Sequence, residues 1–574
     1  MDLLNAKNFS GKVLDHLGLV ADKIDELKLV QRIDEKLPLH GACKVTMGER
    51  VAAMILNGLG FVDTRLYMFP EFLKNAPVSR LFGREIDAGF FNDDSLGRCL
   101  DAISDYGVTK LFTELSFKIG VEKKLLAKSA HFDTSTLQLW GEYEDSSLSD
   151  GKPSEGEAGT CEMTGSTGDS TEQSVTEVKH PIPMRGYSKS HRHDLKQMVI
   201  NLATTGRAAF PIWMESHSGN ASDKKILPDA ALRMREFCRQ LSGAPDFLYV
   251  GDAAMYDNIL KHSAGIKWLS RVPENILQAK KLISRSDTEL KWNILSDGYA
   301  CHIEKSNHSG VDQRWLLVFS EQAFKKEIAT LNRNISKEHA EYEKKFWHIG
   351  NEVFSCQQDA QVSINKISKK MKYHQPKTKI LEVRKHEKSG RPQKDEKPVL
   401  KGYRVECTLE KDEEKIAVAR SKKGRFILAT NELDEKKLSD FDMLPEYKAQ
   451  SGTESGFKFI KDDTFELDSV FLKTPSRISA LMMIMALCLM VYGVSQHDLR
   501  QSLKIHGKTL PDQKRKPTDK PSMKWIYYLF RGAHELTANM GGISKQIVIN
   551  VNELMEEIIG YFGERARAIY FNTA

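Results

Sequence analysis

The stretch DFLYVGDAAMYD, residues 246–257, decides the fold of this chain. Its apolar run stops at Asp252, and the small residues Ala253 and Ala254 follow. The pattern predicts a strand that ends in a turn at a carboxylate. A second stretch, HFDTSTLQLWGEY at residues 131–143, alternates like a half-buried strand and carries Asp133 in its middle. Because adjacent strands lie about 4.8 Å apart, two such carboxylates can share a metal ion, although a strand-terminal Asp is more often a turn or cap residue.

The segments between these two strands predict the rest of a sheet. Residues 195–205 and 207–216 are apolar runs joined at Gly206 and Arg207, which is typical of a hairpin. Residues 226–241 have the periodicity of an amphipathic helix, and residues 266–273 form another short apolar run. The order strand, hairpin, helix, strand, strand predicts an α/β fold with a mixed sheet flanked by helices.

A third carboxylate lies much further along the chain, in YKAQSGTESGFKFIK at residues 447–461. Its polar members, Tyr447, Gln450, Glu454 and Lys461, stand at offsets 0, 3, 7 and 14. On one continuous helix these positions would lie within about 60° of each other. The spacing therefore predicts a single helix face with a phenol, an amide, a carboxylate and an ammonium. Gly452 and Gly456 weaken the expectation of a regular helix, since each costs about 1 kcal/mol relative to alanine.

Composition sets few limits on the partners of the protein. The chain has 574 residues and a net charge of +6, which tolerates a nucleic-acid partner without demonstrating one. None of its eight cysteines forms a C-x-x-C pair, so a zinc ribbon is not expected. We find no secretory signal, no G-x-G-x-x-G and no Walker-type loop. The apolar run 478–494 is short for a membrane span, and we interpret it as a buried core helix.

Several ordered motifs resemble one enzyme family. The offsets of Tyr447, Gln450, Glu454 and Lys461 match the Y-x2-R-x3-E-x6-K spacing of insertion-sequence transposases of the DDE type, the YREK group. The resemblance covers roughly residues 125–500 and includes the segments FDTST, GYSKSHRHDLKQ, HSGNASD, YVGDAAMYDN, WLSRVP and VFSCQQDA. One departure is Gln450, where the family pattern has arginine. An amide can hydrogen-bond a phosphate but supplies no charge.

The resemblance implies a ribonuclease-H-like catalytic domain interrupted by a β-rich inserted lobe. The expected boundaries are a helical, DNA-end-binding domain at 1–125, the first catalytic part at 126–290 with a disordered acidic insertion at 142–179, the inserted α/β lobe at 291–435, the second catalytic part at 436–500, and a basic helical C-terminal region at 501–574. The disorder rests on composition, because ten acids face two lysines between Glu142 and Lys179. The N-terminal helices could equally form a scaffold or a dimerisation unit.

The expected chemistry is two-metal phosphoryl transfer on DNA. Asp133, Asp252 and Glu454 would be the catalytic residues and would hold two Mg²⁺ ions, with Mn²⁺ as a substitute. Asp133 would bridge the two ions. The enzyme would cut at the ends of its element and then join the freed 3′-hydroxyl to target DNA.

The expected DNA contacts lie in two segments. Tyr447, Gln450 and Lys461 would contact DNA near the cut, and Lys514, Arg515 and Lys516 would provide a basic track, unless that track is only a solvated tail. We expect a cytoplasmic, nucleoid-associated protein that forms a homodimer or larger assembly when two ends are brought together. Two alternatives stay open: an inactive, transposase-derived DNA-binding protein, and a ribonuclease-H-like nuclease that cuts without joining.

Overall fold

The computed structural model of the chain contains two compact units. Unit 1 comprises Met1–Trp268 and Pro445–Ala574, and unit 2 comprises Leu269–Leu444. The structure describes residues 9–39, 41, 43–60, 69–140, 143, 180–187, 192–206, 208–241, 243–262, 265–386, 397–460, 472–540 and 543–571. The predicted acidic insertion lies outside the described residues, apart from Tyr143. Each unit is described by itself below.

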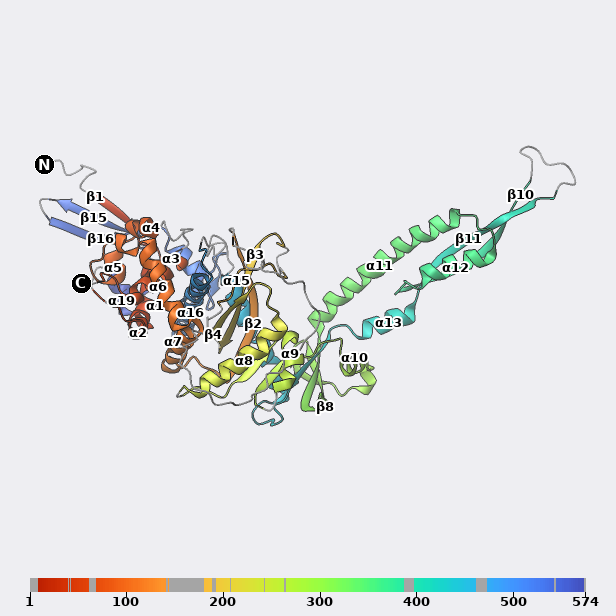
Figure 1. The fold of residues 1–574 in the computed structure, drawn as a ribbon, viewed down its shortest axis with the longest axis horizontal. Coiled ribbons are helices and arrows are strands. Elements are labelled where there is room, and N and C mark those ends of the chain that lie inside the picture. Colours follow the sequence, from red (N-terminus) through yellow and green to blue (C-terminus); the bar gives the residue numbers. More distant parts are fainter. Residues whose placement is uncertain are drawn as a thin grey trace, which may run out of the picture. The chain divides into compact units, whose positions relative to one another are not determined.

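A mixed sheet forms the centre of unit 1. Its strands follow the order β4-β3-β2-β5-β6 (Figure 1), with β2 at Ser129–Leu139, β3 at Lys196–Thr205, β4 at Phe210–Ser218, β5 at Leu248–Gly251 and β6 at Lys267–Arg271. Strands β2, β3 and β4 form an antiparallel meander, and β5 pairs in parallel with β2. Strand β2 therefore lies in the middle of the sheet, and β5 pairs with its first residues and ends at Gly251, while β2 continues to Leu139.

Helices flank this sheet. The flanking helices are α7 (Val108–Glu122), α8 (Asp223–Arg239), α9 (Ala253–Ile259), α15 (Ser451–Ile460) and α16 (Pro475–His506). The predicted hairpin, the predicted helix at 226–241 and the predicted order of strands are confirmed. A mixed sheet of this order with helices on it is a ribonuclease-H-like arrangement, so the predicted fold class is confirmed.

Helix α16 is the core helix of unit 1. It packs against β4 and against two N-terminal helices, α3 (Met47–Leu59) and α6 (Asp93–Tyr106). Within the described residues it is the one helix long and apolar enough to cross a membrane, and 83% of that apolar window is buried inside the protein. The predicted buried core helix is therefore confirmed, and the apolar run is explained by protein contacts on all sides.

The N-terminal helices form as their capping sequences predict. Thr46 and Glu49 make a reciprocal capping box at the start of α3. The predicted apolar stripe of α6 is fully buried, from Leu96 to Ile103. The other helices of this region are α1 (Leu17–Glu26), α2 (Leu29–Lys36), α4 (Phe69–Asn75) and α5 (Val78–Phe82).

The two terminal regions are not purely helical, contrary to our expectation. Strand β1 (Phe9–Val13) pairs with β15 (His534–Met540), which pairs with β16 (Ile543–Ile549) to form a three-stranded antiparallel sheet. The short strand β1 gains its hydrogen bonds from a segment more than 500 residues away, a relationship that local sequence patterns do not contain. The C-terminal region also includes the short strands β13 (Leu510–Pro511) and β14 (Pro517–Thr518) and the helices α17 (Met523–Leu529), α18 (Glu553–Ile559) and α19 (Glu564–Phe571).

Unit 2 contains a second set of strands and one long helix. Its strands follow the order β6-β12-β9-β8-β7, with β7 at Asn293–Ser296, β8 at Tyr299–His308, β9 at Val311–Ser320 and β12 at Arg425–Thr430. The long helix of this unit is α11 (Glu321–Asn351), which is rich in charged residues. Further helices of this unit are α10 (Leu277–Ile283), α12 (Gln357–Ser368) and α13 (Glu413–Ser421), and α14 (Asp440–Lys448) begins in it.

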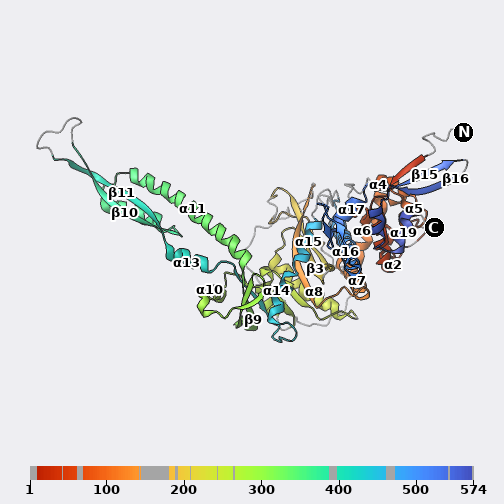
Figure 2. The ribbon, with the colours of Figure 1, turned by 180° about the vertical axis from the view of Figure 1, so that it is seen from behind.

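A hairpin extends unit 2 beside its long helix. Strands β10 (His374–Lys385) and β11 (Val399–Lys411) pair with each other and lie along α11 (Figure 2). Their shared core is small and includes Tyr342, Phe346, Ile364 and Val405. Val405 of this hairpin is buried in that core, whereas Leu381, Val399 and Leu400 are exposed.

Candidate active site

Asp133 is a partly exposed residue in the otherwise mostly buried strand β2. The residues before it, Ser129 to Phe132, are buried, whereas Asp133 is partly exposed. One of its carboxylate oxygens accepts a hydrogen bond from the main-chain N–H of Thr134, at 2.8 Å. A carboxylate in the middle of a central strand is costly to bury and has no role in packing the sheet. Its partial exposure leaves it open to a ligand.

Asp252 stands where β5 ends and helix α9 begins. Its side chain accepts a hydrogen bond from the N–H of Ala254, at 2.9 Å, so it serves as the N-cap of α9. The ordinary interpretation of a strand-terminal aspartate is therefore correct. The cap also fixes the direction of the carboxylate at the carboxyl edge of the sheet.

The pairing of β2 with β5 brings these two aspartates level with each other. The parallel register pairs His131 with Val250. Two residues further along both strands stand Asp133 and Asp252. Since neighbouring strands lie about 4.8 Å apart and side chains two residues apart point to the same face, both carboxylates belong to one face, at the edge where β5 ends and β2 continues to Leu139.

Glu454 is held close to this edge by the residues around it on helix α15. The Thr453 hydroxyl lies 3.1 Å from the main-chain carbonyl oxygen of His131 and 2.6 Å from the Thr204 hydroxyl. The helix contacts β2 and β3 (Figure 1), and Thr453 is fully buried. Glu454, the next residue, is exposed. The helix that carries the third acid is thus fixed to the strand that carries the first.

The two glycines of α15 allow the helix to pack closely. A Cβ on Gly452 would lie 2.8 Å from the Cβ of Ala209, and a Cβ on Gly456 would lie 2.9 Å from the Leu489 side chain. Gly452 therefore approaches Ala209 at a distance that only glycine permits, whereas at Gly456 the close atom is the flexible end of the Leu489 side chain. The glycines that weakened the predicted helix are explained by close packing in the tertiary structure.

The expected single helix from Tyr447 to Lys461 is wrong. Helix α14 ends at Lys448 and α15 begins at Ser451, with a turn at Ala449 and Gln450. Within residues 440–495 the structure describes three helices, α14, α15 and α16. The turn lets Gln450 point inward, so the four residues cannot share one helix face. Lys461 lies outside the described residues.

Gln450 has a buried structural contact. Its side-chain amide donates a hydrogen bond to the carbonyl of Phe132, at 3.3 Å, and the residue is 7% exposed. The amide therefore joins the turn before α15 to β2, one residue away from Asp133. The DNA contact expected of Gln450 stays a prediction, as does that of the half-buried Tyr447.

Sequence reasoning missed a polar cluster beneath Asp133. Glu446 accepts a hydrogen bond from the Ser129 hydroxyl, and its carboxylate lies 3.3 Å from Nε2 of His131. The hydrogen bond from His131 lowers the pKa of Glu446 despite its partial burial. The only available sequence signal was the alternation of Ser129, His131 and Asp133 along one face of a strand. This cluster ties helix α14 to β2 as Thr453 ties α15.

The donor set of this site fits a hard divalent cation. Asp133, Asp252 and Glu454 offer only carboxylate oxygens, the ligands that Mg²⁺ prefers. Across the described parts of the chain, no three His, Cys, Asp or Glu side chains already converge closely enough to hold a metal ion. The structure thus brings two acids level and places the third on an adjoining helix.

The predicted basic track occupies an exposed turn. Lys514, Arg515 and Lys516 lie between β13 and β14, and their side chains are exposed. The Asp512 carboxylate accepts hydrogen bonds from the main-chain N–H groups of Lys514 and Lys516, which fixes the turn. The three cations thus stand on a defined loop within unit 1, away from the turn at Gln450 in sequence. Their contact with DNA stays a prediction.

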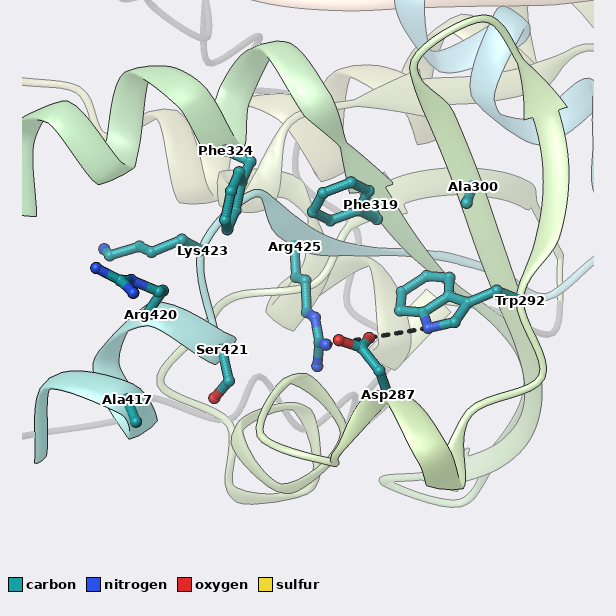
Figure 3. Close-up of a pocket in the computed structure, with 10 residues that line it drawn as sticks. All are labelled: Asp287, Trp292, Ala300, Phe319, Phe324, Ala417, Arg420, Ser421, Lys423 and Arg425. Atoms are coloured by element: carbon teal, nitrogen blue, oxygen red, sulfur yellow. Dashed lines mark hydrogen bonds and ion pairs between the residues drawn. The ribbon is translucent and has the colours of Figure 1, made fainter. Parts of the chain in front are cut away.

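A pocket in unit 2 is chemically different from this site. Its volume is about 540 Å³, and Trp292, Phe319 and Phe324 line it together with basic side chains (Figure 3). The guanidinium of Arg425 is buried and hydrogen-bonded to Asp287 at 2.6 Å, and the Trp292 indole donates to the same carboxylate. Asp287 is the one acid in the lining of the pocket, and its carboxylate is already hydrogen-bonded to Arg425 and Trp292. The pocket therefore offers no set of carboxylates for a metal.

Strand order and the position of the acids define a ribonuclease-H-like domain, and comparison with known families specifies its kind. The family model described as "Transposase DDE domain" matches residues 166–491, which is more than half of the chain. The chain belongs to this family. The matched range includes Asp252 and Glu454 and begins after Asp133. Enzymes of this family act on DNA and generally use divalent metal ions.

Other comparisons add little. The family model described as "Domain of unknown function (DUF4277)" matches residues 9–117. No curated protein matches the chain significantly. Among solved structures, a piggyBac transposase synaptic complex with hairpin DNA is similar at 9% identity, with 90% of this chain and 79% of that chain covered and a TM-score of 0.34. A likeness of this size does not establish a shared fold, so the fold assignment rests on the strand order.

Proposed function

We propose that this protein is the transposase of an insertion sequence of the YREK group. It would cut DNA at the ends of its element and join the freed 3′-hydroxyl to target DNA. The observation that carries the proposal is the β2–β5 register, which brings Asp133 level with Asp252 in a chain of the transposase DDE family. The departure at Gln450 is compatible with the group, because the buried amide supports the turn before the glutamate helix.

Three carboxylates would hold the metal ions of this reaction. Asp133, Asp252 and Glu454 would hold Mg²⁺, two ions in each active site, with Mn²⁺ as a substitute. When bound, such ions neutralise the charge that develops on the attacking and leaving oxygens of a phosphodiester. The N-cap contact of Asp252 and the Thr453 contacts keep two of these acids in place before substrate arrives. Pre-positioned groups lower the entropy cost of reaching the reactive geometry.

DNA would be held by residues outside the acid set. Tyr447 and Lys461 would contact phosphates near the cut, and Lys514, Arg515 and Lys516 would contact the backbone further away. These contacts would be independent of sequence and sensitive to salt. We further propose that the protein acts in the cytoplasm on nucleoid DNA, as a dimer or larger assembly when two ends are joined.

The test is a strand-transfer assay with labelled DNA from the flanks of the element and a plasmid target. Wild type is compared with Asp252→Asn and Asp252→Ala, each in Mg²⁺ and in EDTA. Asparagine is as good an N-cap as aspartate, so Asp252→Asn removes the charge and keeps the cap of α9. Asp252→Ala loses both, and thermal unfolding of the two variants separates a folding defect from a chemical one.

The outcomes distinguish the proposal from its alternatives. Joined products that require Mg²⁺ and disappear in the folded Asp252→Asn variant would support a transposase. Cleavage without joining would indicate a nuclease. Equal DNA binding by wild type and variants, with no cleavage in either, would indicate an inactive DNA-binding derivative.

A further inference from the structure

Helix α17 holds one aromatic side chain at the protein surface. Its residues Met523, Ile526 and Tyr527 are fully buried and fix the helix to the rest of unit 1. Tyr528, the next residue, is 55% exposed, so its ring contributes little to this packing. Tyrosine rings are enriched where proteins contact their partners, because a large rigid ring offers contact area at a low cost in conformational entropy.

Two further side chains extend this ring into a stack. The Trp525 indole stacks on the Tyr528 ring, with the ring centroids 5.4 Å apart and an interplanar angle of 16°. The Arg531 guanidinium lies 5.5 Å from the centroid of the Tyr528 ring, in a cation–π contact. We call Trp525, Tyr528 and Arg531 the aromatic stack. Aromatic rings and guanidinium planes are the groups on which unpaired nucleobases stack in proteins that bind nucleic acids.

The aromatic stack is joined directly to the basic turn. The Trp525 indole N–H donates a hydrogen bond to the main-chain carbonyl of Pro511, at 2.8 Å. Pro511 directly precedes Asp512, which holds the turn through hydrogen bonds with Lys514 and Lys516. The aromatic stack and the exposed cations of the turn therefore lie next to each other in unit 1.

The charge of this part of the chain fits a polyanion. Residues 511–531 contain six lysines and arginines and two aspartates. Lys514, Arg515, Lys516 and Arg531 are all exposed. Such cations bind phosphates whatever the base sequence, and they serve duplex and single-stranded nucleic acids alike. The charge therefore identifies the class of the ligand, and the aromatic stack must decide which form of nucleic acid it is.

The aromatic stack favours an unpaired strand over a duplex. In duplex DNA the neighbouring base pairs cover the faces of each base, and a protein reaches only the base edges and the backbone. In a single strand the base faces are accessible to an aromatic ring. We propose that the aromatic stack and the basic turn together bind single-stranded DNA, with the turn on its phosphates and Tyr528 stacked on a base. This inference rests on the proposed function for its DNA substrate and adds the form of DNA that the C-terminal region holds.

The test measures the affinity of the full chain for fluorescent oligo(dT) and for a fluorescent duplex of the same length, by anisotropy at one salt concentration. EDTA is present throughout, so that no metal-dependent cleavage occurs during the titration. Wild type is compared with Tyr528→Ala, which removes the ring, and with Tyr528→Phe, which keeps it. Trp347→Ala is the matched control, because Trp347 is also a strongly exposed aromatic residue, on helix α11 of unit 2.

Tyr528→Ala should weaken the binding of oligo(dT) by about 10-fold, the usual effect of losing one stack between a base and an aromatic ring. It should change duplex binding by less than about two-fold, because the phosphate contacts remain. Tyr528→Phe and Trp347→Ala should bind both DNAs like wild type. Circular dichroism and thermal unfolding verify that each variant is folded.

Four results would overturn the inference. A wild-type chain that does not bind oligo(dT) has no such site. Unchanged oligo(dT) affinity in the folded Tyr528→Ala variant would show that this ring contacts no base. An equal loss of oligo(dT) and duplex affinity in that variant would leave only phosphate contacts. An equal loss of oligo(dT) affinity in Trp347→Ala would show that the effect is not specific to the aromatic stack.

Failure of this inference and failure of the proposed function give different results. Oligo(dT) binding that depends on Tyr528, in a wild-type chain without strand transfer, would support the single-strand site and contradict the transposase. Strand transfer by a wild-type chain whose oligo(dT) binding does not depend on Tyr528 would support the transposase and overturn the single-strand site.

Discussion

The Thr453 hydroxyl lies 3.1 Å from the main-chain carbonyl oxygen of His131, within hydrogen-bonding distance. This contact joins the residue before Glu454 to the strand position two residues before Asp133. The same hydroxyl lies 2.6 Å from that of Thr204 on β3, so α15 is fixed to two adjacent strands at one point. The Thr453 side chain thus contributes to the position of the third acid.

Replacing Thr453 with valine should reduce both stability and activity. Valine has the shape of threonine but makes neither hydrogen bond, and it leaves the Thr204 hydroxyl and the His131 carbonyl buried without this partner. We expect a loss of about 1–3 kcal/mol in the free energy of unfolding. Strand transfer should fall further than stability explains, because Glu454 is no longer fixed. Denaturant unfolding and initial rates at saturating Mg²⁺ would measure the two effects.

Thr113→Val is the matched control for this variant. Thr113 is also fully buried, and its hydroxyl donates to the carbonyl of Thr109 within helix α7. Thr113→Val should lower the free energy of unfolding without a specific loss of activity. Equal activity in the two variants at equal folded fraction would show that Thr453 has no positioning role.

Gly452→Ala should destabilise the protein although alanine favours helices by about 1 kcal/mol. The new Cβ would lie 2.8 Å from the Cβ of Ala209, a contact that neither backbone can relieve by a rotamer change. Ala209 itself has a positive φ of 46°, which glycine adopts without strain. The double variant Gly452→Ala/Ala209→Gly should therefore recover the wild-type melting temperature. Failure of the second change to rescue the first would contradict this explanation.

The stability of unit 1 should depend on pH through Glu215. Burial alone would raise the pKa of this carboxyl, but hydrogen bonds from Arg233, at 2.7 and 2.8 Å, together with His217 lower it from 4.5 to about 2. A lowered pKa in the folded state stabilises the fold above the ordinary pKa, and this stability is lost as pH falls from 4.5 towards 2. Urea unfolding between pH 2 and 7 should show a decline of roughly 3 kcal/mol from this group.

Arg233→Met should reduce that decline and lower stability at neutral pH, because the buried carboxylate keeps only His217, at 3.2 Å, as a partner. Arg239→Met on the same helix is the control. Arg239 is exposed and pairs only with exposed Glu236, so its loss should change stability by less than about 1 kcal/mol. Equal losses of stability from the two substitutions would contradict a stabilising role of the buried Arg233–Glu215 pair.

The basic turn should determine the salt dependence of DNA binding. Changing Lys514, Arg515 and Lys516 to serine should weaken binding and lower the slope of log affinity against log salt by about one for each lost phosphate contact. An equal change of charge at exposed Lys280, Lys281 and Lys291 tests whether net charge alone is responsible. An identical change of slope in both triple variants would show that net charge, and not this turn, determines the salt dependence.

The sequence predicted well those elements whose residues all lie close together in the chain. The capping box at Thr46, the hairpin around Gly206 and the helix at 321–351 each follow from local patterns. The position of Asp252 at the end of a strand was predicted for the same reason. Its second role as the cap of α9 follows from the chemistry of its side chain.

The errors arose where distant segments decide local structure. The turn at Gln450 exists because its amide bonds Phe132, 318 residues away, and such a bond leaves no periodic signal. Gly452, which appears unfavourable in α15, is required by its close contact with Ala209. The Ser129–His131–Glu446 cluster likewise joins a strand to a helix across a long interval. Spacing alone could identify the acids but could not identify what holds them.

The pairing of β1 with β15 affects how the chain folds during its synthesis. Residues 9–13 leave the ribosome first among the described strands, yet the one described strand beside them lies at residues 534–538. The buried ammonium of Lys23 pairs with nearby Glu26 and gains its second partner, Asp498, only late in synthesis. Contacts of such long sequence separation form late and slow the folding rate. Unit 1 must therefore stay incomplete while the whole of unit 2 is synthesised, and a chain stopped in between would expose α1 and β1 to chaperones and proteases.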